Sequence, residues 1–261
     1  MMKKLFFDDD WKNWIWSNIK NGVSKQRIYD DLIDAGYDVF TIIMELRFIP
    51  AILRKKDETP VSLVMQRLQE YGATKLDTAI PLYQIKSFLS AEECAHIIAI
   101  QKEHHQRSQT GQGKDSKINE IRVSYSTFLE QHKDPLVQHV KERISATLGI
   151  PTQYSEPVQG QWYQKEGFYK AHFDASQSYD EFRHFYGNRT WTCMVTLNEV
   201  IQGGDTYFSK LDIRFKPEIG QALIWYNLGV DGLAHPLTLH GGEPIIQGEK
   251  FILTQWFHQC T

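Results

Sequence analysis

Hydrophobic residues recur at helical spacing near the start of the chain. In the first such segment they fall on one face of a helix: Trp11, Trp14, Ile15 and Ile19. The pattern recurs after Ser24, a residue suited to cap a helix, and once more between Asp38 and Pro50. We therefore expect three short helices that form a small N-terminal helical domain over residues 1–56.

Two further helices are predicted in the middle of the chain, and both have clear end signals. Ser90 precedes the first, and Glu93 stands where it would complete a capping box. Pro135 opens the second helix and Gly149 ends it. Before both helices lies a polar, proline-containing stretch, "RKKDETPVS", and we expect a linker over residues 57–78.

The last part of the chain consists of short runs rich in β-branched and aromatic residues, such as "TWTCMVTLNEV" and "KFILTQWFH". Turn signals such as "QGGD" and "HGGEP" separate many of these runs. Many short strands joined by turns indicate a sandwich or barrel. We expect a mainly β fold with flanking helices, in which a double-stranded β-helix (jelly roll) core at about residues 118–259 lies within a domain at 79–261.

The charge balance argues for no particular macromolecular partner. The chain has 29 Lys and Arg against 32 Asp and Glu, so no basic excess points to nucleic acid or an anionic membrane, and we expect neither as a partner. The N-terminal helices could also form a DNA-binding helix-turn-helix. In that case the second helix would present Asp30, Asp31 and Asp34 to phosphate groups, which would repel them.

The chain shows no targeting or membrane signal. Three aspartates interrupt the N-terminal stretch "MMKKLFFDDDW", where a signal peptide would need a longer apolar run. Charged residues also break every candidate for a membrane span. Cys94, Cys193 and Cys260 lie far apart, so we expect reduced thiols and a cytoplasmic protein.

A candidate metal site appears in the stretch "YQKEGFYKAHFDAS". Residues two apart on a strand point to the same face, so His172 and Asp174 can reach one point in space. His240, before a glycine turn, would complete a set of two histidines and one carboxylate, which suits iron(II) and leaves coordination positions open. His235 is the alternative third ligand.

Lys250 follows His240 by ten residues, in what reads as the next strand. A lysine in an apolar strand most often points to solvent. If Lys250 points inward, it is a buried cation that needs an anion, and a dicarboxylate cosubstrate would provide one.

These motifs and their order resemble the catalytic domain of the prolyl 4-hydroxylase family of iron(II)- and 2-oxoglutarate-dependent dioxygenases. The resemblance covers the chain from about Ala79 to its C-terminus and rests on "HFD", "RTWT", "LNEVIQGGDTYF", "GQALIWYN", "LHGGEPIIQGEK" and "TQWFH". Two motifs depart from the family pattern. "GGDT" stands where the family usually has "GGET", and "HGGEP" replaces a common "HAGCP"; neither change touches the expected ligands.

The resemblance implies roles for ten residues. The iron ligands would be His172, Asp174 and His240. The 2-oxoglutarate site would contain Lys250, Tyr163, Thr192 and Trp256, with Lys250 pairing with the distal carboxylate. The substrate site would contain Arg189, Trp225 and His258.

The function that the resemblance implies is hydroxylation of a prolyl residue in a protein or peptide. Molecular oxygen and 2-oxoglutarate would be consumed, succinate and carbon dioxide released, and ascorbate would serve as reductant. The same chemistry on a free amino acid or small metabolite is one alternative. A jelly roll that binds or senses without turnover is another, although the complete ligand set and Lys250 argue against it.

Overall fold

The structure is a computed structural model that describes residues 4, 7–37, 42, 45–46, 61–108, 122–178 and 188–258. The chain divides into two compact units. The first contains the residues up to 57, and the second begins at residue 58 and runs to residue 258. Within the described residues, no helix combines the length and the apolar character needed to cross a lipid bilayer.

The first unit contains two of the three predicted helices, α1 (Asp9–Lys20) and α2 (Lys25–Asp34). Ser24 caps α2 as expected, because its side chain accepts a hydrogen bond from the Arg27 backbone N–H. This unit has its own hydrophobic core, which consists of Ile15, Ile28, Tyr29, Leu32, Tyr37, Ile42 and Leu46. The third predicted helix falls mostly outside the described residues.

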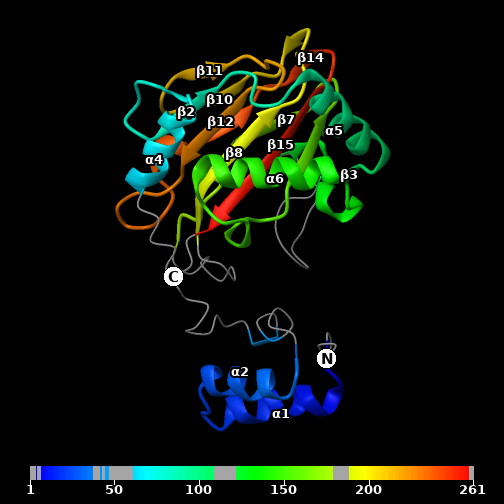
Figure 1. Ribbon diagram of the computed structural model, residues 1–261, viewed down its shortest axis with the longest axis vertical. Helices are drawn as coiled ribbons and strands as arrows, with labels where there is room; N and C mark the ends of the chain where they lie inside the picture. The colour runs from blue at the N-terminus through cyan, green and yellow to red at the C-terminus, as the bar shows by residue number, and fades with distance from the viewer. Residues whose placement is uncertain are drawn as a thin grey trace. The chain divides into compact units, whose positions relative to one another are not determined.

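Antiparallel sheets form the second unit, which confirms the predicted jelly roll (Figure 1). The eight-stranded sheet has the spatial order β1 (Thr74–Lys75), β2 (Leu82–Ile85), β12 (Ala222–Tyr226), β8 (Arg189–Thr196), β15 (Lys250–His258), β6 (Gln159–Tyr163), β5 (Tyr125–Phe128), β3 (Gln106–Arg107). The five-stranded sheet has the order β11 (Ile213–Phe215), β10 (Thr206–Phe208), β13 (His240–Gly242), β7 (Phe168–His172), β4 (Arg122–Val123). A separate ribbon pairs β14 (Ile245–Gln247) with β9 (Gln202–Gly203).

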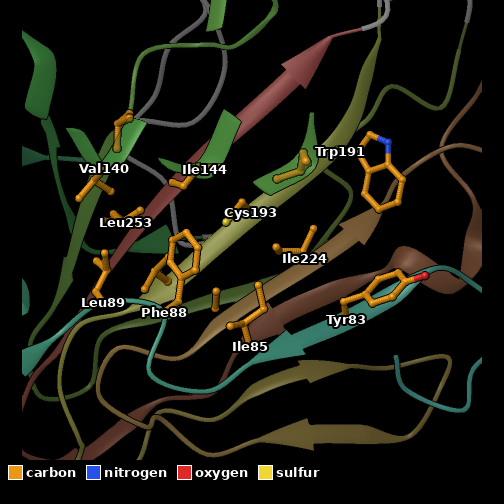
Figure 2. Packing of buried hydrophobic residues seen from close by; sticks show 14 of the residues in the cluster. Tyr83, Ile85, Phe88, Leu89, Val140, Ile144, Trp191, Cys193, Ile224 and Leu253 are labelled. Atoms are coloured by element: carbon orange, nitrogen blue, oxygen red, sulfur yellow. The ribbon is translucent and has the colours of Figure 1, made fainter. Parts of the chain in front are cut away.

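Helices cover the outer face of the eight-stranded sheet. They are α4 (Val61–Glu70), α5 (Ala91–Glu103) and α6 (Pro135–Leu148). Short 3-10 helices lie at η2 (Leu129–His132), η3 (Thr152–Tyr154) and η5 (Pro236–Thr238). The predicted capping box at Ser90 and Glu93 is present, and Gly149 ends α6 in the left-handed conformation. Figure 2 shows Val140 and Ile144 of α6 packed toward Cys193 of β8 and Leu253 of β15.

The linker predicted over residues 57–78 differs from the structure. Helix α4 lies in this segment, and its residues Val64 and Leu68 are fully buried in the core that α5 and α6 share with the sheet. Strand β1 follows and pairs with β2. The polar, proline-containing stretch "RKKDETPVS" that suggested a linker overlaps only the first two residues of α4, and half of the residues of the helix are apolar.

A second hydrophobic cluster lies between the two sheets. The eight-stranded sheet contributes residues such as Met194, Trp225 and Ile252, and the five-stranded sheet contributes Phe208. The inner faces of the two sheets therefore pack on one another, as the alternation of a sandwich requires. This inner space is where the predicted site residues converge.

Candidate metal centre and the cavity around it

His172 and His240 face one another across two neighbouring strands of the five-stranded sheet. They are directly paired in the β7–β13 register, and their ring centroids are 4.4 Å apart. Asp174 follows β7, and its Oδ1 and Oδ2 lie 3.7 Å from His172 Nε2 and 3.8 Å from His240 Nε2. One potential ligand atom from each residue falls within 4.8 Å of the others, so the structure assembles the predicted triad.

Backbone carbonyls orient both imidazoles. The Nδ1 atom of His172 lies 2.9 Å from the Lys170 carbonyl oxygen, and that of His240 lies 2.9 Å from the Thr238 carbonyl oxygen. A carbonyl can only accept, so each ring carries a proton on Nδ1 and presents its Nε2 atom toward Asp174. Two Nε2 atoms and a carboxylate that face one another fit a bound cation, and this donor set is one that iron(II) favours.

The protonation states of the triad also favour a cation. Burial, together with the nearby His240, lowers the pKa of His172 to about 3, so its ring is neutral near pH 7. Burial alone would raise the pKa of Asp174, but the two histidines, Arg189 and a hydrogen bond from Thr192 outweigh it and lower that pKa. The carboxylate is therefore ionised at neutral pH.

Thr192 hydrogen-bonds the carboxylate of Asp174, a contact that the sequence did not predict. Its hydroxyl donates to Asp174 Oδ2 at 2.7 Å and accepts from Asn227 Nδ2 at 2.8 Å. Thr192 is fully buried on β8, and it is not among the described residues that line the cavity. Its place in the cosubstrate pocket stays a prediction.

The two glycines after His240 lie within strand β13 and do not form the turn that the sequence predicted, and close packing requires the first of them. A Cβ atom at Gly241 would lie 2.6 Å from Tyr207 Oη and 2.8 Å from the Tyr169 backbone oxygen, inside van der Waals contact. Only glycine therefore allows β13 to approach β7 closely enough to bring His240 opposite His172.

Lys250 points inward from the first position of β15, and it is only 4% exposed. Its Nζ donates to the Gly204 carbonyl oxygen at 2.6 Å and to Thr206 Oγ1 at 3.0 Å, both of which are neutral acceptors. Burial lowers the pKa of Lys250 to about 8, although Asp205 and Glu243 act in the opposite direction. A buried ammonium held by neutral groups at the cavity wall is suited to an anionic ligand.

Tyr163 lies directly opposite Lys250 in the β6–β15 register and also lines the cavity. Burial raises the pKa of its hydroxyl, while hydrogen bonds with Arg122 and Ser124 lower it in part. Sequence reasoning missed Arg122, a buried cation whose Nε donates to Ser124 Oγ at 2.8 Å and whose guanidinium lies 4.9 Å from the Tyr169 ring centroid.

An ion-pair network forms another wall of the cavity. Arg189 donates through Nε and Nη2 to the two carboxylate oxygens of Glu156, at 2.5 and 2.8 Å. His258 Nε2 lies 2.6 Å from Glu156 Oε1, and the Arg189 guanidinium stands 4.1 Å from the Trp256 ring centroid. Burial opposes ionisation of Glu156, but His258 and Arg189 prevail and lower its pKa to about 2.

A cavity of about 990 Å³ connects these groups. Eight of the ten predicted site residues line it: Tyr163, His172, Asp174, Arg189, Trp225, His240, Lys250 and Trp256. His258 is not in the described lining and acts through Glu156. The alternative ligand His235 serves another purpose, since its side chain caps η5 by accepting from the Leu237 backbone N–H.

Glu156 is the main residue that sequence reasoning missed. It stands outside the strands, in the segment "SEPV", and meets Arg189 and His258 only through the tertiary fold. A lone acidic residue next to a proline gives no local signal of such a role.

The fold is a jelly roll, and the triad of two histidines and one carboxylate is a donor set that suits iron(II). The model of the 2OG-Fe(II) oxygenase superfamily matches residues 158–258, which include all three residues of the triad and Lys250. Prolyl 4-hydroxylase 2 of Arabidopsis thaliana is 32% identical over 196 residues, or 66% of this chain and 65% of that protein. Probable prolyl 4-hydroxylase 6 of the same plant is 31% identical over 210 residues, or 71% of each chain.

A solved structure shows the same fold. The truncated viral collagen prolyl hydroxylase of Paramecium Bursaria Chlorella virus-1 superposes with a TM-score of 0.53 at 24% identity, over 68% of this chain and 89% of that one. The chain belongs to the prolyl 4-hydroxylase family of iron(II)- and 2-oxoglutarate-dependent oxygenases. Its matched region spans just under two thirds of the length of prolyl 4-hydroxylase 2.

Proposed function

We propose that the protein is an iron(II)- and 2-oxoglutarate-dependent hydroxylase that acts on a prolyl residue in a protein or peptide. One observation carries this proposal: ligand atoms of His172, Asp174 and His240 converge within 4.8 Å in a cavity whose wall also contains the buried Lys250. The family to which the chain belongs supports the same conclusion.

The iron would be held by His172, Asp174 and His240, because their Nε2 and carboxylate atoms face one another. Backbone carbonyl groups fix the orientation of both imidazoles. When iron(II), 2-oxoglutarate and oxygen are bound, they supply the oxidant that converts a C–H group to C–OH and release succinate and carbon dioxide. The chain's own contribution is to orient the ligands, bind the cosubstrate and position the substrate.

Lys250 would bind the distal carboxylate of 2-oxoglutarate, with Tyr163 beside it. The two residues are paired in register across β6 and β15, both are buried, and Lys250 has only neutral hydrogen-bond acceptors. A carboxylate there would give the buried ammonium a charged hydrogen-bond acceptor in addition to its two neutral ones.

The substrate would lie against Arg189 and Trp225 on the other walls, with His258 close to it. Trp225 provides a buried aromatic face, and Glu156 holds Arg189 and also contacts His258. A cavity of about 990 Å³ lies within the range of small-molecule sites and has room for 2-oxoglutarate together with a substrate group.

We further propose ascorbate as the reductant and a reducing, cytoplasmic setting. Iron that is oxidised in an unproductive turnover must be reduced again to iron(II), and ascorbate would supply the electron. The free, buried thiols of Cys94 and Cys193 are compatible with a reducing compartment.

The test is succinate release from purified protein with iron(II), ascorbate and 2-oxoglutarate, with and without proline-containing peptides. We expect iron-dependent succinate that the peptide stimulates, with a gain of one oxygen atom in the peptide. The control is His172→Ala, a variant that lacks one of the three expected iron ligands. Peptide-independent succinate would contradict the choice of substrate, and the absence of succinate from a protein that binds iron would contradict the hydroxylase.

A further inference from the structure

The loop that leaves β12 and ends at η5 is closed at its stem. It covers residues 228–234, and we call it the clasp loop. Leu228 and Ala234, its first and last residues, form an antiparallel bridge. One step further out, the His235 backbone N–H donates to the Asn227 carbonyl oxygen at 2.8 Å. The two ends of the loop are therefore held together by the backbone.

A first connection joins the clasp loop to the segment that follows Asp174. The Ala234 backbone N–H donates to the carbonyl oxygen of Ser176, which stands two residues after Asp174, at 2.9 Å. Asn188 spans the same gap with its side chain. Its Oδ1 accepts from the Ser176 backbone N–H at 2.8 Å, and its Nδ2 donates to the Gly232 carbonyl oxygen at 3.1 Å. One amide thus bridges the loop and the ligand segment.

The hydrogen-bonding capacity of Asn188 is fully used. Its Oδ1 also accepts from the Arg189 backbone N–H at 3.1 Å, and its Nδ2 also donates to the Ser176 carbonyl oxygen at 3.4 Å. Asn188 is only 6% exposed, and its amide accepts two hydrogen bonds and donates two, which is all that this group can do. An ionised aspartate has the same shape and could accept both hydrogen bonds, but it would donate none and would release Gly232.

A second connection starts at Asn227, which is fully buried at the stem of the loop. Its Nδ2 donates to Thr192 Oγ1 at 2.8 Å, and the Thr192 hydroxyl donates to Asp174 Oδ2 at 2.7 Å. Because an amide nitrogen can only donate, the hydroxyl must accept from it and direct its single proton at Asp174. Asn227 therefore sets the direction of the hydrogen bond that Asp174 receives.

The same stem reaches His240 through backbone groups. The His235 carbonyl oxygen accepts from the backbone N–H of Thr238 at 2.9 Å and from its hydroxyl at 2.7 Å. The Thr238 carbonyl oxygen in turn lies 2.9 Å from His240 Nδ1 and orients that ring. Two of the three expected ligands, Asp174 and His240, are thus connected to one loop.

We propose that Asn188 and Asn227 are positioning residues for the metal ligands, and that the closed form of the clasp loop and metal binding stabilise one another. This inference rests on the proposed function for the identity of the metal and adds to it the elements that set metal affinity. A loop whose closed form holds two ligands in place favours binding of the ion, and by linkage the ion stabilises that closed form equally. Neither asparagine is among the described residues that line the cavity, so their effect is exerted through the ligands.

The first measurement is hydrogen–deuterium exchange of the full-length protein without 2-oxoglutarate or substrate. It is made with and without manganese(II), a divalent ion that replaces iron(II) and does not start oxygen chemistry. We expect the backbone amides of Ala234 and His235, which close the loop, to exchange roughly tenfold more slowly with the ion. The control is His172→Ala, which lacks a ligand and should show no such protection. Equal exchange with and without bound ion in the wild type would overturn the coupling.

The second measurement compares two isosteric variants. Asn188→Asp keeps the two accepted hydrogen bonds, which hold the new carboxyl in its ionised form, and removes the two donated ones. The matched control is Asn198→Asp, because Asn198 also joins backbone groups, from the Phe251 N–H at 2.7 Å to the Glu249 carbonyl oxygen at 2.7 Å, and lies outside the described cavity lining. Manganese(II) titration followed by electron paramagnetic resonance gives the Kd and the spectrum of the bound ion.

We expect Asn188→Asp to raise the Kd for manganese(II) roughly tenfold, to change the spectrum of the bound ion and to abolish its protection of the clasp loop, and Asn198→Asp to behave as the wild type. A new negative charge alone would attract the cation, so a weaker affinity reports the positions of the ligands. Asn227→Asp tests the second connection and serves if the first variant does not fold. Its carboxylate would take the Thr192 proton away from Asp174, with an expected 10- to 100-fold rise in Kd.

Unchanged affinity and unchanged loop protection in these asparagine variants would overturn the proposal. The outcome of the succinate assay is separate, because none of these measurements needs turnover. Coupling in a protein that releases no succinate would support the clasp loop and contradict the hydroxylase. Succinate release without coupling would do the reverse, and a wild type that binds neither manganese(II) nor anaerobic iron(II) would contradict both.

Discussion

His172 and His240 stand directly opposite one another on β7 and β13, with ring centroids 4.4 Å apart. Sheet pairing fixes this relationship, and backbone carbonyls hold both Nδ1 atoms. The two imidazoles therefore reach their positions through folding alone. A metal site of this kind loses little orientational freedom when the ion binds.

His240 and His235 should respond differently to replacement. We expect His240→Ala to abolish turnover and weaken iron binding, because a buried member of the triad is lost. His235→Ala removes only the cap of η5, which costs about 1 kcal/mol of stability and leaves most activity. Iron titration and succinate release check both; the reverse pattern would mean that the third ligand was misassigned.

Thr192 should affect iron affinity without contacting the metal. Thr192→Val keeps the side-chain shape but removes the hydrogen bond to Asp174 and leaves Asn227 Nδ2 without its acceptor. We expect a roughly 10- to 100-fold loss of iron affinity, with Thr192→Ser as the control that retains the hydroxyl. Equal affinities of the valine and serine variants in a metal titration would argue against this positioning role.

Lys250 should determine the affinity for 2-oxoglutarate. Removal of a charge-assisted hydrogen bond costs about 1.5–3 kcal/mol, so Lys250→Ala should raise the KM for 2-oxoglutarate roughly 10- to 100-fold. The iron requirement should change little. Steady-state kinetics with varied cosubstrate and varied iron separate the two effects, and an equal rise in both would count against carboxylate pairing.

The lowered pKa of Lys250 predicts a pH dependence. The ammonium that would pair with the carboxylate is present below a pKa of about 8 and is lost as the pH rises through it. We therefore expect the KM for 2-oxoglutarate to rise by up to about tenfold per pH unit above 8. Lys250→Arg stays charged and should give a flatter profile; identical profiles would assign the effect to another group.

Glu156 should stabilise the fold in a pH-dependent way. Its pKa lies at about 2 in the folded protein against an ordinary value of 4.5, so its stabilisation is fully present above pH 4.5 and is lost as the pH falls toward 2. At neutral pH the ionised carboxylate of Glu156 adds roughly 3 kcal/mol to the free energy of unfolding. Urea unfolding of Glu156→Gln should show this loss at pH 7 and a smaller one at pH 3, whereas a constant difference would exclude the ion pair as its source.

Local patterns predicted most of the helices and the strand-rich region, and together with the family resemblance they predicted the ligand motif. The capping box at Ser90, the end of α6 at Gly149 and the pair of His172 and Asp174 each depend on residues a few positions apart. The choice of His240 over His235 also came from sequence, through the glycine turn and the spacing to Lys250.

The surroundings of the site could not be predicted in the same way. Thr192 meets Asp174 and Glu156 meets His258 through contacts between separate elements, and these depend on which strands become neighbours. Helix α4 was missed for a different reason. The polar, proline-containing stretch "RKKDETPVS" was extended into it as a linker, although the apolar residues Val64, Met65 and Leu68 that follow have helical spacing and pack on the core.

Strand β15 begins with Lys250 and ends with His258, and every residue in it is buried. Eight steps of about 3.3 Å separate the two ends by about 26 Å. Under the roles proposed above, this one strand sets the distance between the lysine that would bind the cosubstrate and the histidine that contacts Glu156. Side chains alternate between the two faces of a strand, so deletion of a single residue within β15 would turn one of these two side chains away from the interior.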